Sequence, residues 1–346
     1  MKVCCTILHA AELGQDDRIK WGQIQESCNI YKSPFYSFEY VEAVASVHRG
    51  VRICRMTSNG HVIAYFPYQY TCRSHELLGI AQIVGAEMTD SCGILKVPGV
   101  LLNWGQLLST SNIAYFWGTH IQNLEECDHS LVVQTDAGFS IDLSEGTDAF
   151  IKSLQLRKKK LWADTQRRER QLVREHGPLR YVFCDNTHED ELSRLILKKR
   201  QQYQRSRVPD PLSPIWRQEL LRTLLGLRSN ACQGVLSTLY AGDTWVASHF
   251  GLKGFNTLHY WFPVYNISLH RFSPGRLLLK ATIEACEVHG VTQINRGQGI
   301  QEFKEEWANH TQNFYRLMWY RPNIWGLIGR VSMSLTWRSR FMRRHT

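Results

Sequence analysis

The stretch "GVLSTLYAGDTWVASHFGLKGFNTLHYWFPVYN" (234–266) and its continuation "ISLHRFSPGRLLLKATIEACEVHGVTQIN" (267–295) decide the fold. Three β-rich runs are separated by turn signals at Gly242-Asp243 and Gly254, which predicts an antiparallel meander of three strands. Ser273-Pro274 then begins an amphipathic helix, and "VTQIN" indicates a further strand. The order of meander, glycine-containing corner, helix and strand predicts a mixed α+β domain.

The segments on either side of this stretch extend the same pattern. Before it, the sequence predicts a basic helix that ends at Gly177-Pro178, a strand, and two further helices, the first capped near Thr187. After it we expect a short helix and a last strand. The expected segments are a helix over 157–177, a strand over 179–185, helices over 187–207 and 213–230, a helix over 300–308 and a strand over 313–320.

The first half of the chain carries weaker signals. "KSPFYSFEYVEAVASV" (32–47) predicts a helix, and Asn59-Gly60 joins two β-rich runs into a hairpin over 51–70. "GFSIDL" (138–143) indicates a strand, and Ser144 follows it as the expected N-cap of a helix.

The chain has 346 residues, and 43% of them are hydrophobic. This length and composition predict two domains, or two halves of one fold, with a sizeable core. We expect an N-terminal half over 1–150, a basic helical arm over 151–178, a C-terminal domain over 179–320 and a basic aromatic tail over 321–346.

The ten cysteines form no C-x-x-C pair and have no histidines at zinc-ligand spacing. This pattern predicts reduced, mostly buried thiols and no bound metal. No run of 18 apolar residues occurs, and the N-terminal run lacks the features of a signal peptide. We therefore expect a cytoplasmic protein.

The net charge of +10 is concentrated in two segments. Residues 152–174 and 316–346 each carry +7, which leaves the remaining chain at −4. Such local basic surfaces do not indicate a protein that coats DNA. The basic arm fits an anion, such as a phosphorylated carrier, a membrane surface or tRNA, or else it is a solvated helix face.

The tail mixes aromatic residues with arginine, as helices at anionic bilayers do. We therefore expect peripheral contact at the inner membrane face; packing of the tail onto the fold and disorder are the alternatives.

Several motifs occur together in the order of a known family. "LSTLYAGDTWVASHFGL", "RFSPGRLLLKATIEACEVHG" and "INRGQGIQEFKEEW" resemble the acetyltransferase domain of the CelD-type proteins of cellulose biosynthesis, within the GNAT superfamily. "SPFYSFEYVEAV" and "RKKKLWADTQRRERQLVREHGPLRYV" fit the same family, so the resemblance covers most of residues 30–310. The family is similar to the FemABX aminoacyltransferases. The resemblance implies an α+β fold of tandem GNAT-like halves, with mixed, mostly antiparallel sheets flanked by helices.

The resemblance also implies an acyl-CoA donor, expected to be acetyl-CoA. A GNAT site needs a strand that splays from its neighbour and a glycine-containing turn at a helix N-terminus, whose N–H groups receive the pyrophosphate. Pro263 cannot donate to a ladder and suits the splayed strand, but Pro274 stands where the usual GNAT turn has its first glycine. An ordinary helix start is the alternative for this corner. The expected donor-binding residues are Pro263, Val264, Arg271, Ser273, Gly275 and Arg276.

The second motif, "INRGQGIQEFKEEW" (294–307), resembles a family loop with two glycines followed by an aromatic residue and lysine. Asn295 stands where aspartate is common in relatives; it can cap the loop as aspartate does, but it is no base. Lys304 either faces the substrate or a phosphate, or lies on the helix surface beside glutamates. The expected substrate-binding residues are Asp243, Gly297, Gly299, Phe303 and Lys304.

Acyl transfer by direct attack of an amine or hydroxyl needs no protein nucleophile. A histidine in the meander is suited to accept a proton near neutral pH, and a hydrogen-bonded core histidine is the alternative. The expected catalytic residues are His249, His259, Tyr260 and Asn295.

These features together predict an acyltransferase that moves an acyl group, expected to be acetyl, from CoA to an amine or hydroxyl of a sugar or polysaccharide precursor. Exopolysaccharide or cellulose production is the expected setting. One alternative is a FemABX-like transferase that takes its acyl group from aminoacyl-tRNA, with the basic arm holding the RNA. The other is a GNAT-fold partner protein without catalysis.

Overall fold

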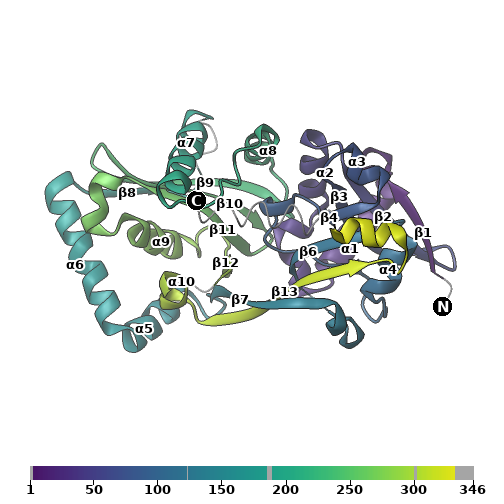
Figure 1. The fold of residues 1–346 in the computed structure, drawn as a ribbon. Helices are drawn as coiled ribbons and strands as arrows, with labels where there is room; N and C mark the ends of the chain where they lie inside the picture. The colour runs from purple at the N-terminus through teal and green to yellow at the C-terminus, as the bar shows by residue number, and fades with distance from the viewer. Residues whose placement is uncertain (1–2, 123, 185–188, 300–301, 332–346) are drawn as a thin grey trace. The chain divides into compact units, whose positions relative to one another are not determined.

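The chain forms two compact units, neither of which is continuous in sequence. The computed structural model describes residues 3–122, 124–184, 189–299 and 302–331 (Figure 1). Unit 1 comprises residues 1–31, 44–136 and 313–346, and unit 2 comprises residues 32–43 and 137–312. The four consecutive segments expected from the sequence therefore differ from these units. The reason is that each unit includes segments that are distant in sequence. Strand β13 pairs with β6 of unit 1, and residues 32–43 belong to unit 2.

Unit 1 contains a mixed sheet in the order β1-β2-β3-β4-β6-β13. All of these pairs are antiparallel except β4–β6, and the short strand β5 pairs with β3. The strands are β1 (Val3–Leu8), β2 (Val51–Ser58), β3 (His61–Tyr70), β4 (Ile80–Ile83), β5 (Leu95–Lys96), β6 (Tyr115–Ile121) and β13 (His310–Tyr320). The labelled helices of this unit are α1 (Gln15–Glu26), α3 (Arg73–Leu77) and α4 (Trp104–Thr110), and residues 324–331 are also helical. Helix α2 (Phe38–Val47) spans the boundary between the units.

Unit 2 repeats this arrangement in the order β8-β9-β10-β11-β12-β7. Its pairs are antiparallel except β11–β12. Figure 1 shows α7 and α8 on one face of this sheet and α9 on the other. The strands are β7 (Val132–Asp142), β8 (Leu179–Val182), β9 (Gln233–Ala241), β10 (Thr244–Gly254), β11 (Thr257–Tyr265) and β12 (Gln293–Gln298). The helices are α5 (Thr147–Arg157), α6 (Lys159–His176), α7 (Glu189–Arg205), α8 (Ile215–Gly226), α9 (Pro274–Ala285) and α10 (Glu302–Trp307).

The units share a strand order but exchange their last strands. β7 follows β6 in the chain, yet it pairs with β12 of unit 2. β13 follows β12, yet it pairs with β6 of unit 1. Each unit buries its own hydrophobic core, with Trp104 and Phe116 in unit 1 and Phe250 and Phe272 among the fully buried side chains of unit 2. The predicted fold class, mixed α+β with mostly antiparallel sheets flanked by helices, is confirmed.

Short 3₁₀ turns fill several connections, and two of them bear on the site. η3 (Pro34–Tyr36) lies in the N-terminal segment of unit 2, and η6 (Ile267–Phe272) precedes α9. The others are η1 (Ala10–Glu12), η2 (Asn29–Lys32), η4 (Ala86–Met88) and η5 (Glu126–Leu131).

Local signals placed most elements correctly. The Asn59-Gly60 hairpin and the three-stranded meander are present, and the basic helix ends at Gly177 as predicted. The helix expected over 32–47 begins later, at Phe38, because the Ser37 hydroxyl accepts a hydrogen bond from the Tyr40 N–H at 3.0 Å. The Ser144 cap is wrong, since α5 begins after Gly146. The Thr187 cap lies outside the described residues.

The expectation that all thiols are reduced is wrong for one pair. A disulfide joins Cys5 on β1 to Cys54 on β2, whose Cα atoms are 6.2 Å apart. The β1–β2 register places Cys54 opposite Ile7, which brings it close to Cys5 on the neighbouring strand. The two cysteines are 49 residues apart and belong to no motif, so this pairing was not predictable from the sequence. Among the described residues, no helix is both long enough and apolar enough to cross a bilayer.

Candidate active site

The opening between β11 and β12 is the feature around which the site is built. These parallel strands pair only from Thr257–Gln293 to His259–Asn295. Beyond that point β11 continues along β10, and β12 continues along β7. Pro263 and Val264 lie on the part of β11 that has left β12, opposite His249 and Ser248 of β10. The splayed strand predicted from the sequence is therefore present.

Two of the predicted catalytic residues stack on each other beside this opening. The rings of His249 and Tyr260 are 4.1 Å apart and nearly parallel. His249 is fully buried, with its Nδ1 3.3 Å from the Ser237 hydroxyl, and burial lowers its pKa to about 3. Its imidazole is therefore neutral at physiological pH and a weak base. That His249 is the general base stays a prediction, and the low basicity of the buried imidazole does not favour it.

Tyr260 and His259 are also buried. The Tyr260 hydroxyl has no hydrogen-bond partner among the described residues, and burial raises its pKa. His259 packs edge-on against Phe35, with ring centroids 4.8 Å apart. Phe35 belongs to η3, so the N-terminal segment of unit 2 covers this part of the strand. Tyr260 is thus a buried hydroxyl at the first position beyond the paired part of β11.

Lys199 is the functional candidate that sequence reasoning missed. It lies on α7 and is only 8% exposed, and its Nζ donates to the carbonyl oxygen of Pro263 at 3.1 Å. Burial, with a smaller effect of the Lys304 charge, lowers the pKa of Lys199 to about 8. In the sequence Lys199 is one of two adjacent lysines in a charged helix, and only its helical phase relative to buried apolar residues such as Leu195 and Ile196 distinguished it.

The second predicted motif extends from β12 to α10. The Asn295 Oδ1 accepts the Gly297 N–H at 2.8 Å, which is the capping role that aspartate or asparagine can fill, and Gly297 has a left-handed φ of 69°. The Gly299 N–H donates to Ala137. The ammonium of Lys304 donates to the Gln298 carbonyl oxygen at 2.8 Å. Asn295 and Gly297 therefore lie within β12, and Lys304 of α10 contacts the last residue of that strand.

Phe303 and Arg296 belong to the same motif. The Phe303 side chain is 55% exposed, and the Arg296 guanidinium lies over its ring at 5.7 Å from the centroid. Arg296 is buried and donates to the carbonyl oxygens of Phe303 and Lys304, and burial lowers its pKa to about 10. Asp243 lies apart from this group, on the exposed β9–β10 turn, six residues from His249 or roughly 20 Å along the strand. The structure does not bring Asp243 to His249.

The corner before α9 differs from the predicted phosphate site. Ser273 has left-handed φ and ψ of 52° and 56°, and its side chain makes no capping bond. Pro274 has no N–H, and the Arg276 N–H donates to the Ser273 carbonyl oxygen at 2.9 Å. A Cβ at Gly275 would meet its nearest neighbour, Tyr265, only at 3.9 Å. The Gly275 N–H thus remains for a ligand, in a space that a side chain would fill.

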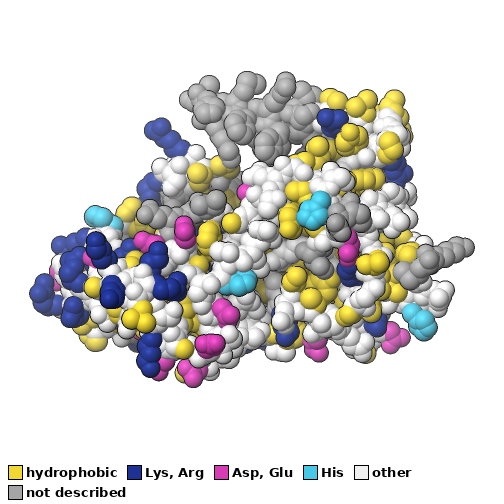
Figure 2. Space-filling view, turned by 90° about the horizontal axis from the view of Figure 1, so that it is seen from below, with side chains coloured by type: hydrophobic (Ala, Val, Ile, Leu, Met, Phe, Trp, Pro, Cys, Tyr) yellow, Lys and Arg dark blue, Asp and Glu magenta, His cyan; other side chains and the backbone are white. Residues whose placement is uncertain are grey.

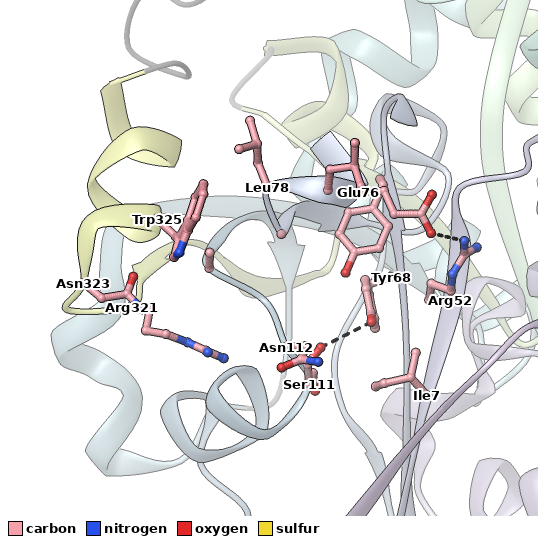
Figure 3. Close-up of a pocket in the computed structure, with 14 residues that line it drawn as sticks. Ile7, Arg52, Tyr68, Glu76, Leu78, Ser111, Asn112, Arg321, Asn323 and Trp325 are labelled. Carbon is pink, nitrogen blue, oxygen red and sulfur yellow. Dashed lines mark hydrogen bonds and ion pairs between the residues drawn. The ribbon is translucent and has the colours of Figure 1, made fainter. Parts of the chain in front are cut away.

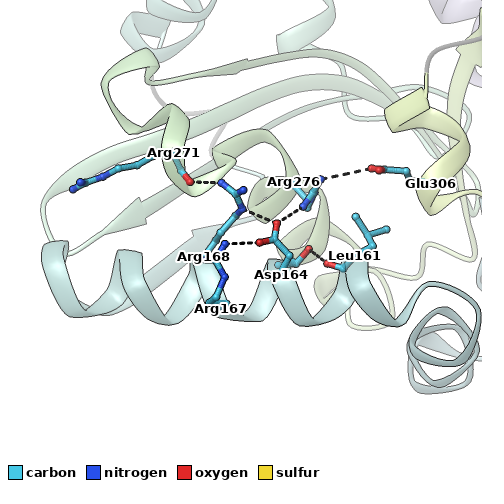
Figure 4. Close-up of polar contacts among 8 residues, drawn as sticks. Leu161, Asp164, Arg167, Arg168, Arg271, Arg276 and Glu306 are labelled. Carbon is cyan, nitrogen blue, oxygen red and sulfur yellow. Dashed lines mark hydrogen bonds and ion pairs between the residues drawn. The ribbon is translucent and has the colours of Figure 1, made fainter.

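The two arginines of the corner have acidic partners, and Figure 4 shows those of Arg276. Arg276 pairs with Asp164 at 3.1 Å and with Glu306 at 3.8 Å. Arg271 pairs with Glu175 and lies over the Phe272 ring. These contacts connect the corner to α6 and α10, a tertiary arrangement that the local sequence does not reveal. The guanidinium charges predicted to meet phosphate are therefore partly neutralised.

Cations without acidic partners line a groove beside Arg276. The groove has a volume of about 750 Å³ and lies between the start of α6, the start of α9 and α10. Figure 2 shows Lys and Arg side chains gathered on this part of unit 2, over α5 and α6. Within the described chain, no ion pair is found for Lys158, Lys159 or Lys160. The residues that line the groove are Leu156, Arg157, Lys158, Lys159, Lys160, Leu161, Asp164, Arg276, Glu305 and Glu306.

A second hollow of about 440 Å³ lies in unit 1 (Figure 3). Arg52 is paired with Glu76 at one side of it, and Arg321 and Trp325 lie at the other. The Tyr68 hydroxyl, whose pKa burial raises, points toward the Ser111 carbonyl oxygen at 3.5 Å. No residue that the sequence singled out as catalytic lies in this hollow.

Comparison with known proteins agrees with this geometry. Residues 160–305 match the family model of the acetyltransferase (GNAT) domain. Similar solved structures include FemX, with 9% identity over 94% of this chain and 100% of that chain and a TM-score of 0.56. The C-terminal DUF2156 domain of a putative lysylphosphatidylglycerol synthetase from Agrobacterium fabrum has 11% identity over 93% of this chain and 95% of that chain, with a TM-score of 0.55.

The similarity to these two structures is one of fold alone. The family model matches the segment that contains the splayed strands β11 and β12. No curated protein gives a significant match to the sequence. Residues 160–305 therefore match a GNAT acetyltransferase domain, and this match indicates an acyltransferase.

Proposed function

We propose that the protein transfers an acyl group, acetyl by resemblance to the CelD-type family, from acyl-CoA to an amine or hydroxyl of a sugar or polysaccharide precursor. The opening between β11 and β12 beyond His259 and Asn295 carries this proposal. Backbone groups on a strand that has lost its neighbour are available to the amide groups of a pantetheine arm. Exopolysaccharide or cellulose production is the setting that the family resemblance suggests.

The residues present fit an acyl-CoA donor in two places. Gly275 offers an N–H and an open space at the start of α9, which suits a phosphate oxygen. The groove beside it adds Lys158, Lys159 and Lys160, which lie at the N-terminal end of α6. We assign the phosphates of the donor to Gly275 and to this groove, rather than to Arg271 and Arg276 alone.

The donor supplies an activated thioester, and the protein must position the acceptor and take its proton. Lys199 has the pKa best matched to this task, because a group with a pKa of about 8 is partly neutral at physiological pH. We propose that its neutral amine accepts the proton that the attacking amine or hydroxyl releases. The exposed Phe303 ring provides an apolar face of the kind on which a sugar ring packs.

Titration calorimetry with acetyl-CoA tests the proposal directly. We expect Gly275→Ala to weaken acetyl-CoA binding by about 1–3 kcal/mol, because the added methyl group fills the space at the phosphate-facing N–H. The fold should be unaffected or slightly stabilised. Gly22→Ala is the matched control, since Gly22 also lies in a helix, α1, with open space around its Cα. Absence of acetyl-CoA binding by the folded wild-type protein would reject the proposal.

An aminoacyl-tRNA donor is the second candidate, and the basic face of unit 2 favours it. Lys152, Lys158, Lys159, Lys160, Arg170 and Arg174 have no acidic partner among the residues with described positions. A polyanion that contacts several of them would bind with a steep salt dependence. Retention of tRNA that weakens about 10³-fold or more between 50 and 200 mM salt, together with no acetyl-CoA binding, would favour this candidate. Binding of neither donor by the folded chain would favour a non-catalytic partner protein.

A further inference from the structure

The segment after β13 forms a helix in unit 1 whose glycines are buried and whose large apolar side chains are exposed. Residues 324–331 are helical, and the Asn323 side chain caps them by accepting the Gly326 N–H at 3.0 Å (yellow helix in Figure 1). The two buried positions are the glycines, Gly326 and Gly329. The larger apolar residues all lie on the exposed side.

Close packing explains why the glycines face inward. A Cβ at Gly326 would lie 2.0 Å from the Arg321 carbonyl oxygen, and one at Gly329 would lie 2.5 Å from the Tyr115 Cβ on β6. Only glycine permits the helix to lie this close to the Arg321 backbone at one position and to β6 at the other. Since the glycine face is held against unit 1, the opposite face must point to solvent.

That opposite face is apolar. The exposed fractions are 68% for Ile324, 52% for Trp325, 55% for Leu327, 38% for Ile328 and 51% for Val331. A soluble protein places such side chains together in water chiefly where another surface covers them. We call these five residues the tail-helix patch.

The charge around the tail-helix patch identifies what covers it. Arg321 and Arg330 flank the patch, and residues 316–346 contain seven arginines and no acidic residue. An apolar face with a tryptophan and surrounding arginines suits the boundary between anionic headgroups and acyl chains, whereas a purely apolar protein partner would not require this charge. The hollow in unit 1 shares Trp325 with the patch and is also lined by Arg321, which provides polar space for a headgroup (Figure 3).

We propose that the tail-helix patch docks the protein on the surface of an anionic bilayer. The apolar side chains enter the boundary of the acyl chains, and Arg321 and Arg330 contact the headgroups. This docking does not depend on the identity of the acyl donor. It would hold the transferase at the membrane surface, where lipid-linked precursors are found.

Co-sedimentation of the full chain with vesicles tests the proposal. We expect binding to phosphatidylcholine vesicles that contain about 30% phosphatidylglycerol, and much weaker binding to phosphatidylcholine alone. The double variant Leu327→Glu/Ile328→Glu should reduce binding to the anionic vesicles about tenfold or more, since it places carboxylates in the apolar face. Val288→Glu, at a position of unit 2 that is 86% exposed, is the matched control and should bind as the wild type does.

Four outcomes would overturn the proposal. The first is that the wild type does not bind anionic vesicles, and the second is that the double variant binds them as well as the wild type does. The third is that the double variant changes the sedimentation coefficient of the lipid-free protein from oligomer to monomer, which would make the patch an interface between copies of the chain. Circular dichroism spectra of the variants establish that they are folded. The fourth is that Lys158→Glu/Lys159→Glu/Lys160→Glu loses vesicle binding while Leu327→Glu/Ile328→Glu retains it, which would show that α6 contacts the bilayer.

Discussion

Lys199 is a lysine with almost no exposed surface, and its ammonium lies against the carbonyl oxygen of Pro263 on the splayed strand. Burial makes its charged form costly, so its pKa is lowered to about 8. Burial also shifts the pKa values of His249 and Tyr260, whose rings stack on each other. Burial leaves the histidine neutral and the phenol protonated, which makes Lys199 the titrating group of this cluster near physiological pH.

The lowered pKa of Lys199 predicts a pH-dependent stability. The unfolded state holds the Lys199 proton up to a pKa of about 10.4, whereas the folded state releases it near 8, so the free energy of unfolding should rise with pH between these values. Below pH 8 the cost of the buried charge is fully present. Relative to Lys199→Met, the wild type should gain on the order of 3 kcal/mol between pH 7 and pH 10.5.

Guanidinium unfolding of both proteins across this pH range measures the difference, and Lys198→Met, at a less buried neighbour, is the control. A constant difference between wild type and Lys199→Met would contradict the buried position. If Lys199 also accepts the acceptor's proton, kcat should rise with an apparent pKa near 8 in the wild type. That dependence should be absent in Lys199→Met.

At the scale of elements, α6 is held to the start of α9 by a single carboxylate. Asp164 accepts from Arg167 and Arg168 at 2.6 Å and from Arg276 at 3.1 Å, while Arg168 also donates to the Arg271 carbonyl oxygen. The hydrogen bond from Arg168 is the largest cause of the lowered pKa of Asp164. A chain of contacts therefore links the basic helix to the corner where we place the donor's phosphates.

This linkage makes Asp164→Asn informative. The stability that Asp164 contributes is present above its ordinary pKa of about 3.9 and is lost as the pH falls through its lowered pKa in the folded state. At pH 7 the Asp164→Asn variant should therefore be less stable than the wild type by about 1 kcal/mol. Because Arg276 loses an acidic partner, affinity for acetyl-CoA should increase. Thermal unfolding and calorimetry measure the two effects. Weaker acetyl-CoA binding at unchanged stability would show that the carboxylate itself contacts the donor.

At the scale of the whole molecule, each unit is assembled from segments that are distant in the chain. β12 of unit 2 pairs with β7, which precedes α5 in the chain. Unit 2 also includes residues 32–43, whose Phe35 ring packs against His259 at 4.8 Å and against Trp261 at 5.4 Å. A contiguous C-terminal domain cut from the sequence therefore lacks parts of its own sheet and core.

A fragment of residues 179–320, the C-terminal domain expected from the sequence, should consequently fail to fold as an independent unit. It exposes the edge of β12 and the surface that Phe35 covers, and an unpaired edge strand promotes aggregation. We expect a broad thermal transition or none in circular dichroism, in contrast to a cooperative transition of the full chain. A sharp, reversible transition of the fragment would show that the exchanged strands are dispensable.

Local backbone preference explains which features the sequence determined. Asn59-Gly60 and Gly242-Asp243 favour tight turns, and alternating apolar residues favour strands, so the hairpin and the meander follow from neighbours in the chain. The splayed strand was predictable through Pro263, which cannot donate to a ladder. The segment of Asn295 and Gly297 was predictable through its motif.

The tertiary structure decided the features that depend on long-range contacts. The sequence did not determine which sheet receives β7 and β13, because strand pairing depends on surfaces far apart in the chain. Nor did it show that Arg271 and Arg276 find acidic partners on other helices, or that Lys199 is buried. The charge state of a side chain depends on the groups folded around it, and those groups come from distant segments.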